Sequence, residues 1–134
     1  MNGGEDVPPI FLNGGAMRGG PLHHLLDGAP LVAPAGTAPR YRFYSVGDRC
    51  PALSPVAHGG TRVAGEVYEV TLDVLRDRLL PAEPPELELG VIELDDGSSA
   101  LAMLLRRPYT SYVGLTDITE HGSWQSYRCS KEAA

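Results

Sequence analysis

Residues 10–26, IFLNGGAMRGGPLHHLL, form the stretch that most constrains the fold. Its apolar start predicts the end of a strand that covers residues 7–12, and the glycine-rich segment 13–20 predicts a loop. Pro21 suits the first position of a helix, and the leucines after it recur at helical spacing, so we expect a short helix over residues 21–27. Successive backbone N–H groups in a glycine loop that leads into a helix form a potential anion site.

Side chains within this loop could add to such a site. The Asn13 amide can donate hydrogen bonds, and the absence of a Cβ at Gly14 and Gly15 lets a ligand approach the backbone. Arg18 could pair with a carboxylate through two parallel hydrogen bonds. A glycine-rich turn that binds nothing is the alternative.

Two neighbouring histidines follow the loop. On a helix His23 and His24 point about 100° apart, so only one of them can face the loop. Histidine suits acid–base chemistry near neutral pH, and a purely structural histidine is the alternative.

The remaining pattern favours strands over helices. We expect an α+β fold, a small mixed β-barrel with short flanking helices, in a single domain over residues 9–127. A disordered N-terminus (1–8) and a flexible tail (128–134) would flank the domain. Beyond the opening stretch, we expect strands over 29–35, 41–46, 61–70, 87–94 and 99–106, a helix over 72–80, a long loop over 47–60, and mostly irregular structure over 107–134.

The composition excludes several classes of function. A net charge of −6 argues against binding nucleic acid, which requires a basic patch. The one lysine, Lys131, lies near the C-terminus, so we expect no Schiff-base or serine–lysine chemistry. Cys50 and Cys129 are too few for a zinc site and are expected to be free thiols; we expect no metal and no cofactor. No signal peptide and no membrane-spanning run are evident, so we expect a cytoplasmic protein with no membrane partner.

Two further groups of polar residues are candidates for a site. Alternation along the strand at 41–46 puts Arg40 and Tyr44 on one face, where they could hold an acid or lie in solvent. Glu83 and Glu86 sit among prolines after the expected helix. A glutamate held beside a cavity could have a raised pKa and act as a base, and exposed glutamates are the alternative.

Taken in order, several segments resemble the allophanate hydrolase C-terminal domain, a branch of the gamma-glutamylcyclotransferase-like superfamily. The wider superfamily is suggested by the glycine loop and by Gly65-Glu66-Val67-Tyr68. The closer match, over residues 10–127, rests on Phe11-Leu12-Asn13-Gly14, Arg18-Gly19, Leu22-His23-His24, Thr37 to Tyr44, Gly90 to Gly97, Asp117-Ile118-Thr119, Gly122 and Trp124.

The resemblance implies a small mixed barrel with a pocket at the end of the first strand. It also implies a lyase or hydrolase of bacterial urea metabolism that acts on a small N-carboxylated amide or urea, by decarboxylation or C–N cleavage. This chain resembles that domain standing alone, without an amidase domain. By the same resemblance, Asn13, Gly14 and Gly15 would bind a carboxylate, His24 would serve as the acid–base residue, and Arg40 and Tyr44 would orient the anion.

Two alternatives to this activity stay open. Glu83 lies near the position of the catalytic glutamate in gamma-glutamylcyclotransferases, so Glu83 or Glu86 could be the base for gamma-glutamyl cyclisation. The chain could also be a non-catalytic module that binds a ligand or associates with a separately encoded amidase. Assembly into a homodimer is left open as well.

Overall fold

The first strand, β1 (Pro9–Leu12), lies in the middle of an eight-stranded mixed sheet. The computed structural model describes residues 7–106 and 114–133. The last three residues of β1 are each no more than 5% exposed, and a strand buried on both faces needs such a continuous apolar run. β1 pairs antiparallel with β5 (Ala64–Glu69) and parallel with β7 (Ser99–Leu105).

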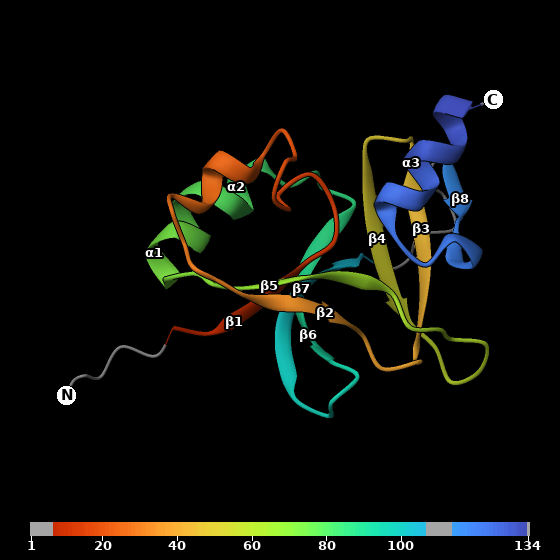
Figure 1. The fold of residues 1–134 in the computed structure, drawn as a ribbon, viewed down its shortest axis with the longest axis horizontal. Helices are drawn as coiled ribbons and strands as arrows, with labels where there is room; N and C mark the ends of the chain where they lie inside the picture. The colour runs from red at the N-terminus through yellow and green to blue at the C-terminus, as the bar shows by residue number, and fades with distance from the viewer. Residues whose placement is uncertain (1–6, 107–113, 134) are drawn as a thin grey trace.

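The other strands extend this sheet and curl it toward a barrel (Figure 1). The strand order is β2-β5-β1-β7-β4-β3-β8, and β6 pairs with β7. Isolated backbone bridges, Tyr41 with Thr61 and Thr37 with Leu94, connect segments outside these ladders. The predicted α+β fold with a mixed, barrel-like sheet and short flanking helices is confirmed. The remaining strands are β2 (Leu31–Gly36), β3 (Tyr41–Val46), β4 (Cys50–Pro55), β6 (Leu87–Glu93) and β8 (Leu115–Asp117).

The helical segments are short and lie at two ends of the molecule (Figure 1). Leu75 and Leu79 share an apolar cluster with Ile10 and Tyr68 of the sheet, which fixes the predicted helix after β5 against β1 and β5. The segments are η1 (His23–Leu26), α1 (Leu72–Val74), η2 (Leu75–Leu79, a π-helical turn), α2 (Leu80–Ala82), η3 (Thr119–His121) and α3 (Trp124–Ala133).

Gly65 shows why the strand after residue 60 contains a glycine. A Cβ at this position would lie 2.5 Å from the Leu12 carbonyl oxygen and 2.6 Å from Cζ of Phe11. The close approach between β5 and β1 therefore requires glycine, as expected for a glycine inside a strand.

Two parts of the sequence-based description are wrong. Residues 50–55, expected in a long loop, form β4, which pairs with β3 along its length but meets β7 at one position, Leu53 with Leu104. Prolines fit a strand whose second edge is largely open. Residues 124–133, expected as irregular structure and from 128 onward as a flexible tail, form α3, whose Trp124 and Tyr127 are buried in the main core. Residues 1–6, most of the expected disordered N-terminus, lie outside the described residues.

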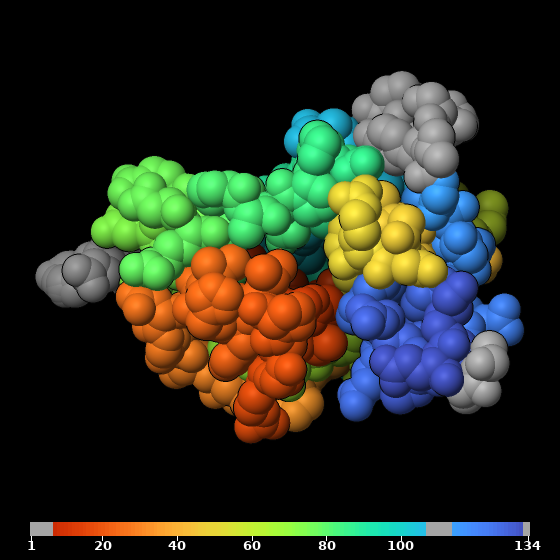
Figure 2. All heavy atoms as spheres, turned by 90° about the horizontal axis from the view of Figure 1, so that it is seen from above, coloured from red at the N-terminus to blue at the C-terminus, as the bar shows by residue number. Residues whose placement is uncertain are grey.

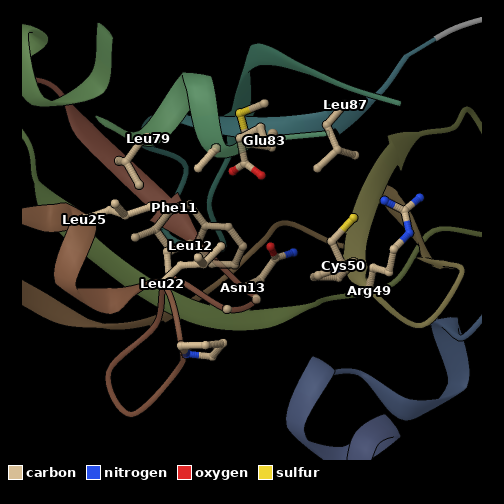
Figure 3. Close-up of a pocket in the computed structure, with 17 residues that line it drawn as sticks. Phe11, Leu12, Asn13, Leu22, Leu25, Arg49, Cys50, Leu79, Glu83 and Leu87 are labelled. Carbon is tan, nitrogen blue, oxygen red and sulfur yellow. The ribbon is translucent and has the colours of Figure 1, made fainter. Parts of the chain in front are cut away.

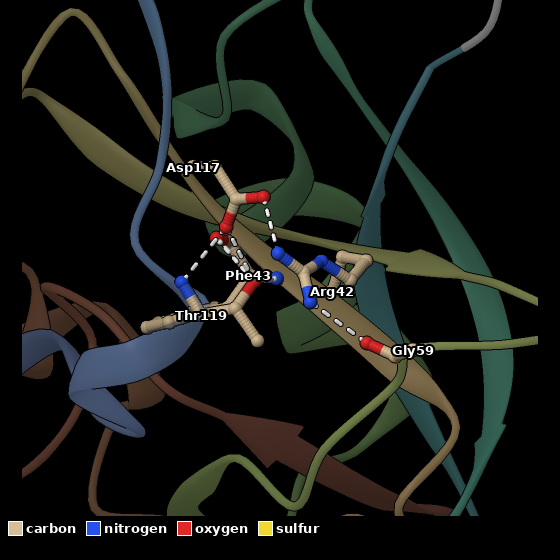
Figure 4. A network of polar contacts seen from close by, with 5 residues as sticks. All are labelled: Arg42, Phe43, Gly59, Asp117 and Thr119. Atoms are coloured by element: carbon tan, nitrogen blue, oxygen red, sulfur yellow. Dashed lines mark hydrogen bonds and ion pairs between the residues drawn. The ribbon is translucent and has the colours of Figure 1, made fainter.

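A polar network attaches the C-terminal segment to β3 (Figure 4). The buried Thr119 hydroxyl accepts from the Phe43 N–H at 2.9 Å and donates to Asp117 Oδ1 at 2.6 Å. Arg42 donates to Asp117 Oδ2 at 2.6 Å and to the Gly59 carbonyl at 2.8 Å. This network secures β8 and η3 beside β3.

None of the helices in the described part of the chain has the length and apolar character needed to span a membrane.

Candidate functional site

A pocket of about 90 Å³ opens where β1 passes into the glycine loop. Figure 2 shows the loop, the green helical segment and the yellow β3–β4 turn around a hollow in the surface. Segments that are distant in sequence thus form one site. The residues that line the pocket are Phe11, Leu12, Asn13, Gly14, Gly15, Ala16, Pro21, Leu22, Leu25, Arg49, Cys50, Pro51, Leu79, Ala82, Glu83, Leu87 and Met103.

The loop is held in shape by its own backbone and by β5. The Met17 N–H donates to the Gly14 carbonyl at 3.1 Å, and the Arg18 N–H donates to Glu66 Oε1 at 2.9 Å. The buried Tyr68 hydroxyl donates to the same Glu66 oxygen at 2.8 Å. Burial, together with this hydrogen bond, raises the pKa of Tyr68 to about 12, so the hydroxyl stays protonated and keeps donating.

Gly14 lets the loop pack closely against the start of β4. A Cβ at this position would lie 2.7 Å from Cδ of Pro51. A side chain there would therefore push apart two walls of the pocket.

Hydrogen-bond donors lie together in the pocket wall that residues 13–15 form. The Asn13 side-chain nitrogen is buried and has no hydrogen-bond partner in the described residues. Within residues 7–106 and 114–133, no hydrogen bond uses the N–H of Gly14 or Gly15 either. An unpaired buried donor costs roughly 1–3 kcal/mol, which an oxygen atom of a ligand would offset.

Glu83 contributes a carboxylate to the same pocket. Pro84 disfavours helical geometry in the residue before it, and Glu83 accordingly has φ −82° and ψ 143° at the end of α2. Its carboxylate points into the pocket (Figure 3) and, within the described residues, has no hydrogen-bond or ion-pair partner. Burial raises the pKa of Glu83, because desolvation disfavours the charged form.

The start of β4 supplies a thiol and a guanidinium that sequence reasoning did not assign to the site. Burial raises the pKa of Cys50 to about 11; the positive charge of Arg49 opposes this shift, and the negative charges of Glu83 and Glu86 add to it. A thiol with this pKa is protonated at neutral pH and makes a poor nucleophile. Arg49 lies beyond Cys50 at the edge of the pocket, where its Nη2 is 3.2 Å from Glu86 Oε2 (Figure 3).

A hairpin signal could have located these two residues. Gly47 and Asp48 both have positive φ, 60° and 59°, between strands β3 and β4. Three residues, 47–49, separate the two strands, and a short connection that contains Gly is typical of a hairpin, but the prolines of β4 obscured the second strand.

The two histidines do not reach the pocket. His24 is exposed and is absent from the pocket lining, so the geometry gives no support to the acid–base role expected for it. His23 packs instead on Tyr68, with ring centroids 5.7 Å apart, and its Nδ1 lies 3.1 Å from the Ala16 carbonyl oxygen. Leu22, which precedes the short η1 helix, and Leu25 within it line the pocket instead.

The arginines and the tyrosine expected to hold the anion also lie elsewhere. Arg18 contributes its backbone N–H to Glu66 and does not line the pocket. Arg40 pairs with Glu93 at 3.0 Å, and Tyr44 packs with the apolar cluster around Val46. Of the predicted site residues, the structure therefore brings together Asn13, Gly14, Gly15 and Glu83.

Comparison with known proteins agrees with the fold. The family model described as "Allophanate hydrolase C-terminal domain" matches residues 8–129. The crystal structure of c4763, a uropathogenic E. coli-specific protein, is 35% identical with a TM-score of 0.83, and the match covers 91% of this chain and 95% of that one.

Two further solved structures extend the comparison. Kluyveromyces lactis allophanate hydrolase is 25% identical with a TM-score of 0.85; the match covers 94% of this chain but only 22% of that enzyme. An AIG2-like mouse protein, 22% identical with a TM-score of 0.61 and covering 87% of this chain and 86% of its own, shares the fold. Among curated proteins, none matches the chain. The extent of the family match, together with the 35% identical relative, shows that this chain belongs to the allophanate hydrolase C-terminal domain family.

Proposed function

We propose that the chain is an enzyme that removes CO₂ from a small N-carboxylated amide or urea, with Glu83 as the proton donor. The observation that carries this proposal is the location of Glu83 in the same pocket as the donors of residues 13–15, while His24 lies outside it. The family to which the chain belongs supports the substrate class.

The reaction is a protonation coupled to cleavage of a C–N bond. The Glu83 carboxyl O–H gives its proton to the substrate nitrogen, the C–N electron pair moves onto that nitrogen, and the carboxylate carbon leaves as CO₂. The Glu83 carboxylate then recovers a proton from solvent. A carboxyl whose pKa is raised by burial is protonated in a larger fraction of molecules near neutral pH, which favours this role.

The pocket has one wall of hydrogen-bond donors and one apolar wall, and these suit the two ends of such a substrate. Donors that hold the departing carboxylate would stabilise the ground state more than the transition state, because CO₂ is uncharged. We therefore place the retained carbonyl on Asn13 and the glycine N–H groups, and the departing carboxylate against the apolar side formed by Phe11, Leu79 and Leu87.

The size of the pocket favours this substrate class over gamma-glutamyl dipeptides. At about 15 Å³ for each water-sized position, a volume of about 90 Å³ holds about six such positions. N-carboxyurea has about seven non-hydrogen atoms and fits this scale, whereas a gamma-glutamyl dipeptide has about twice as many. The dipeptide would have to project from the mouth, with Glu83 acting as a base in its cyclisation.

The test is CO₂ release from N-carboxyurea by the purified chain, measured above the uncatalysed rate. We expect Glu83→Gln to lower the rate at least 100-fold, the lower bound for loss of a positioned acid. Glu88→Gln, which removes an exposed carboxylate paired with Arg106, is the matched control and should retain activity.

The other outcomes separate the alternatives. Release of 5-oxoproline from a gamma-glutamyl dipeptide without CO₂ release would establish the cyclotransferase activity instead. Saturable binding of a small carboxylate with no turnover of either substrate would identify a binding module. CO₂ release that survives Glu83→Gln would remove Glu83 from the mechanism.

A further inference from the structure

The outer edge of β6 carries backbone groups that point away from the sheet. The even-numbered residues of β6 face β7: the Leu94 N–H donates to the Ser98 carbonyl, and the Glu86 carbonyl accepts from the Arg106 N–H. Hydrogen-bonded positions alternate along an antiparallel ladder, so the N–H and C=O groups of the odd-numbered residues point away from β7. The outer edge therefore consists of residues 87, 89, 91 and 93.

Both ends of this edge are closed by other parts of the chain. At one end the Leu87 N–H donates to the Pro84 carbonyl at 3.1 Å, and the Leu87 carbonyl accepts from Arg106 Nη2 at 2.9 Å. At the other end both backbone groups of Glu93 bond to the segment 38–41, at 2.8 and 3.0 Å. The edge is thus open over its middle alone.

Leu89 and Val91 form this open middle. Within residues 7–106 and 114–133, no hydrogen bond uses the outward-pointing backbone groups of these two residues. Their side chains lie on the same face of the strand and are 37% and 66% exposed. The edge therefore presents unpaired backbone groups beside exposed apolar side chains.

The other edges of the sheet carry features that prevent pairing with another chain. β2, at one end of the strand order, contains Pro34 and an irregular register between Leu31 and Ala33. β8, at the other end, is three residues long, and the largely open side of β4 has Pro51 and Pro55. Prolines, bulges and short length are the usual protections of an edge strand. The open positions of β6 carry no such protection, which indicates that another strand covers them.

A second copy of this chain fits the open positions in one register. If two β6 strands pair antiparallel about Gly90, Leu89 of each copy faces Val91 of the other, and every unpaired backbone group gains a partner. A shift by two residues would instead place Leu89 opposite Glu93, whose backbone groups are already bonded.

The charges at the ends of the edge also favour a second copy. In the register centred on Gly90, Glu93 lies opposite Leu87 of the second copy, and the Arg106 guanidinium lies on the Leu87 carbonyl. The Glu93 and Arg106 side chains are 41% and 49% exposed. An acid at one end of the strand and an arginine at the other are therefore brought together twice by a two-fold axis.

We propose that this chain forms a two-fold symmetric dimer through the outer edges of two β6 strands, with Leu89 of each copy hydrogen-bonded to Val91 of the other. The apolar side chains of these residues form the centre of the interface, and the Glu93 and Arg106 side chains form its charged rim. The dimer does not depend on the proposed activity, because Leu89 and Val91 are absent from the pocket lining.

The test is analytical ultracentrifugation of the full chain over a range of concentrations. The wild type should reach twice the mass of one chain. Val91→Lys should raise the dissociation constant at least about tenfold, because the two-fold axis places the change in the interface twice. Val91→Pro should have a similar effect, since it deletes an outward-pointing N–H and leaves the ladder with β7 intact.

Val32→Lys is the matched control. Val32 is 55% exposed and lies on β2, outside the proposed interface, so this variant should keep the dissociation constant of the wild type. Circular dichroism would verify that all three variants are folded. Hydrogen exchange locates the interface: the Leu89 and Val91 amides should exchange at least about tenfold more slowly in the dimer than in the dilute monomer.

Several results would overturn the proposal. A wild type that is monomeric at every concentration would do so, and would leave the edge to a strand of a different protein. A dimer that survives both Val91 substitutions, equal weakening by Val32→Lys, or exchange of the two amides that does not change with concentration would place the interface elsewhere.

Discussion

Replacing Glu83 with glutamine should stabilise the protein at alkaline pH while it abolishes activity. The Glu83 carboxylate is partly buried beside apolar side chains, and no cation among the described residues pairs with it. Its pKa is therefore raised by desolvation. Glutamine has nearly the same shape and no charge to desolvate, so it removes the cost of burying the anion.

The sign follows from proton linkage. Because the pKa of Glu83 is higher in the folded than in the unfolded chain, the folded state binds more protons between the two values. The free energy of unfolding of the wild type therefore falls as pH rises from the ordinary glutamate pKa, about 4.3, to the folded value. The loss is about 1.4 kcal/mol for each unit by which the pKa is raised.

Thermal unfolding followed by circular dichroism measures this difference. At pH 4 the Glu83→Gln variant and the wild type should unfold at nearly the same temperature. At pH 8 the variant should unfold higher, by about 3–5 °C for each kcal/mol in a domain of this size. Glu88→Gln controls for the loss of a carboxylate as such, since Glu88 is exposed and ion-paired.

A Glu83→Gln variant that is less stable than the wild type at pH 8 would refute this reasoning. That result would mean that the charged carboxylate has a stabilising partner and is poorly suited to hold a proton. A difference in unfolding temperature that does not change with pH would equally exclude a raised pKa.

Three further substitutions test the assignment of the pocket. His24→Ala should leave CO₂ release within about twofold of the wild type and change stability by less than about 0.5 kcal/mol, because His24 is exposed and outside the pocket; a large loss in the activity assay would return His24 to the mechanism. Gly14→Ala should lower CO₂ release from N-carboxyurea at least several-fold, since its Cβ would lie 2.7 Å from Pro51 Cδ. Thr119→Val should lower the free energy of unfolding in urea by about 1–3 kcal/mol, because it leaves the buried Phe43 N–H without its acceptor, and should leave CO₂ release by the folded protein unchanged (Figure 4).

Much of the fold could be predicted because its signals are local. The strand Tyr41–Val46 alternates buried and half-buried side chains as far as Ser45 and has the predicted bounds. The hairpin between β6 and β7 follows from Asp95-Asp96-Gly97, with Gly97 at φ 87°. A glycine inside a strand indicates a bulge or a close approach by another backbone, and the structure has the close approach at Gly65.

The missed elements depend on contacts distant in sequence. β4 carries two prolines, so its propensity is low, and the ladder it shares with β3 stabilises it. The helix α3 has a polar composition, and burial of Trp124 and Tyr127 against the sheet is what selects it. Local propensity cannot reveal these stabilising contacts, because the partner residues lie elsewhere in the chain.

The residues of the candidate site could be predicted only where local backbone structure sets their position. Asn13, Gly14 and Gly15 form a loop because of their residue types, and Glu83 leaves the helix because Pro84 follows it. The expected roles of His24, Arg18 and Arg40 depended on the direction of a side chain relative to distant elements. That direction is decided by packing, which places leucines of η1 against the pocket and leaves His24 in solvent.

The packing that holds the helical segment in place also raises the pKa of Glu83. Leu79 anchors the helical segment in the apolar cluster between it and the sheet, and it also lines the pocket that Glu83 enters. The apolar surface that stabilises the fold is therefore the surface that desolvates the carboxyl and raises its pKa. The pocket lies at the ends of β1 and α2 and at the start of β4. These ends of the elements supply the polar groups, and the core behind them supplies the low dielectric that raises the pKa of Glu83. Stability and acid strength are consequently coupled at this site, because loosening the core around Leu79 would admit water and return Glu83 toward the pKa of an ordinary glutamate.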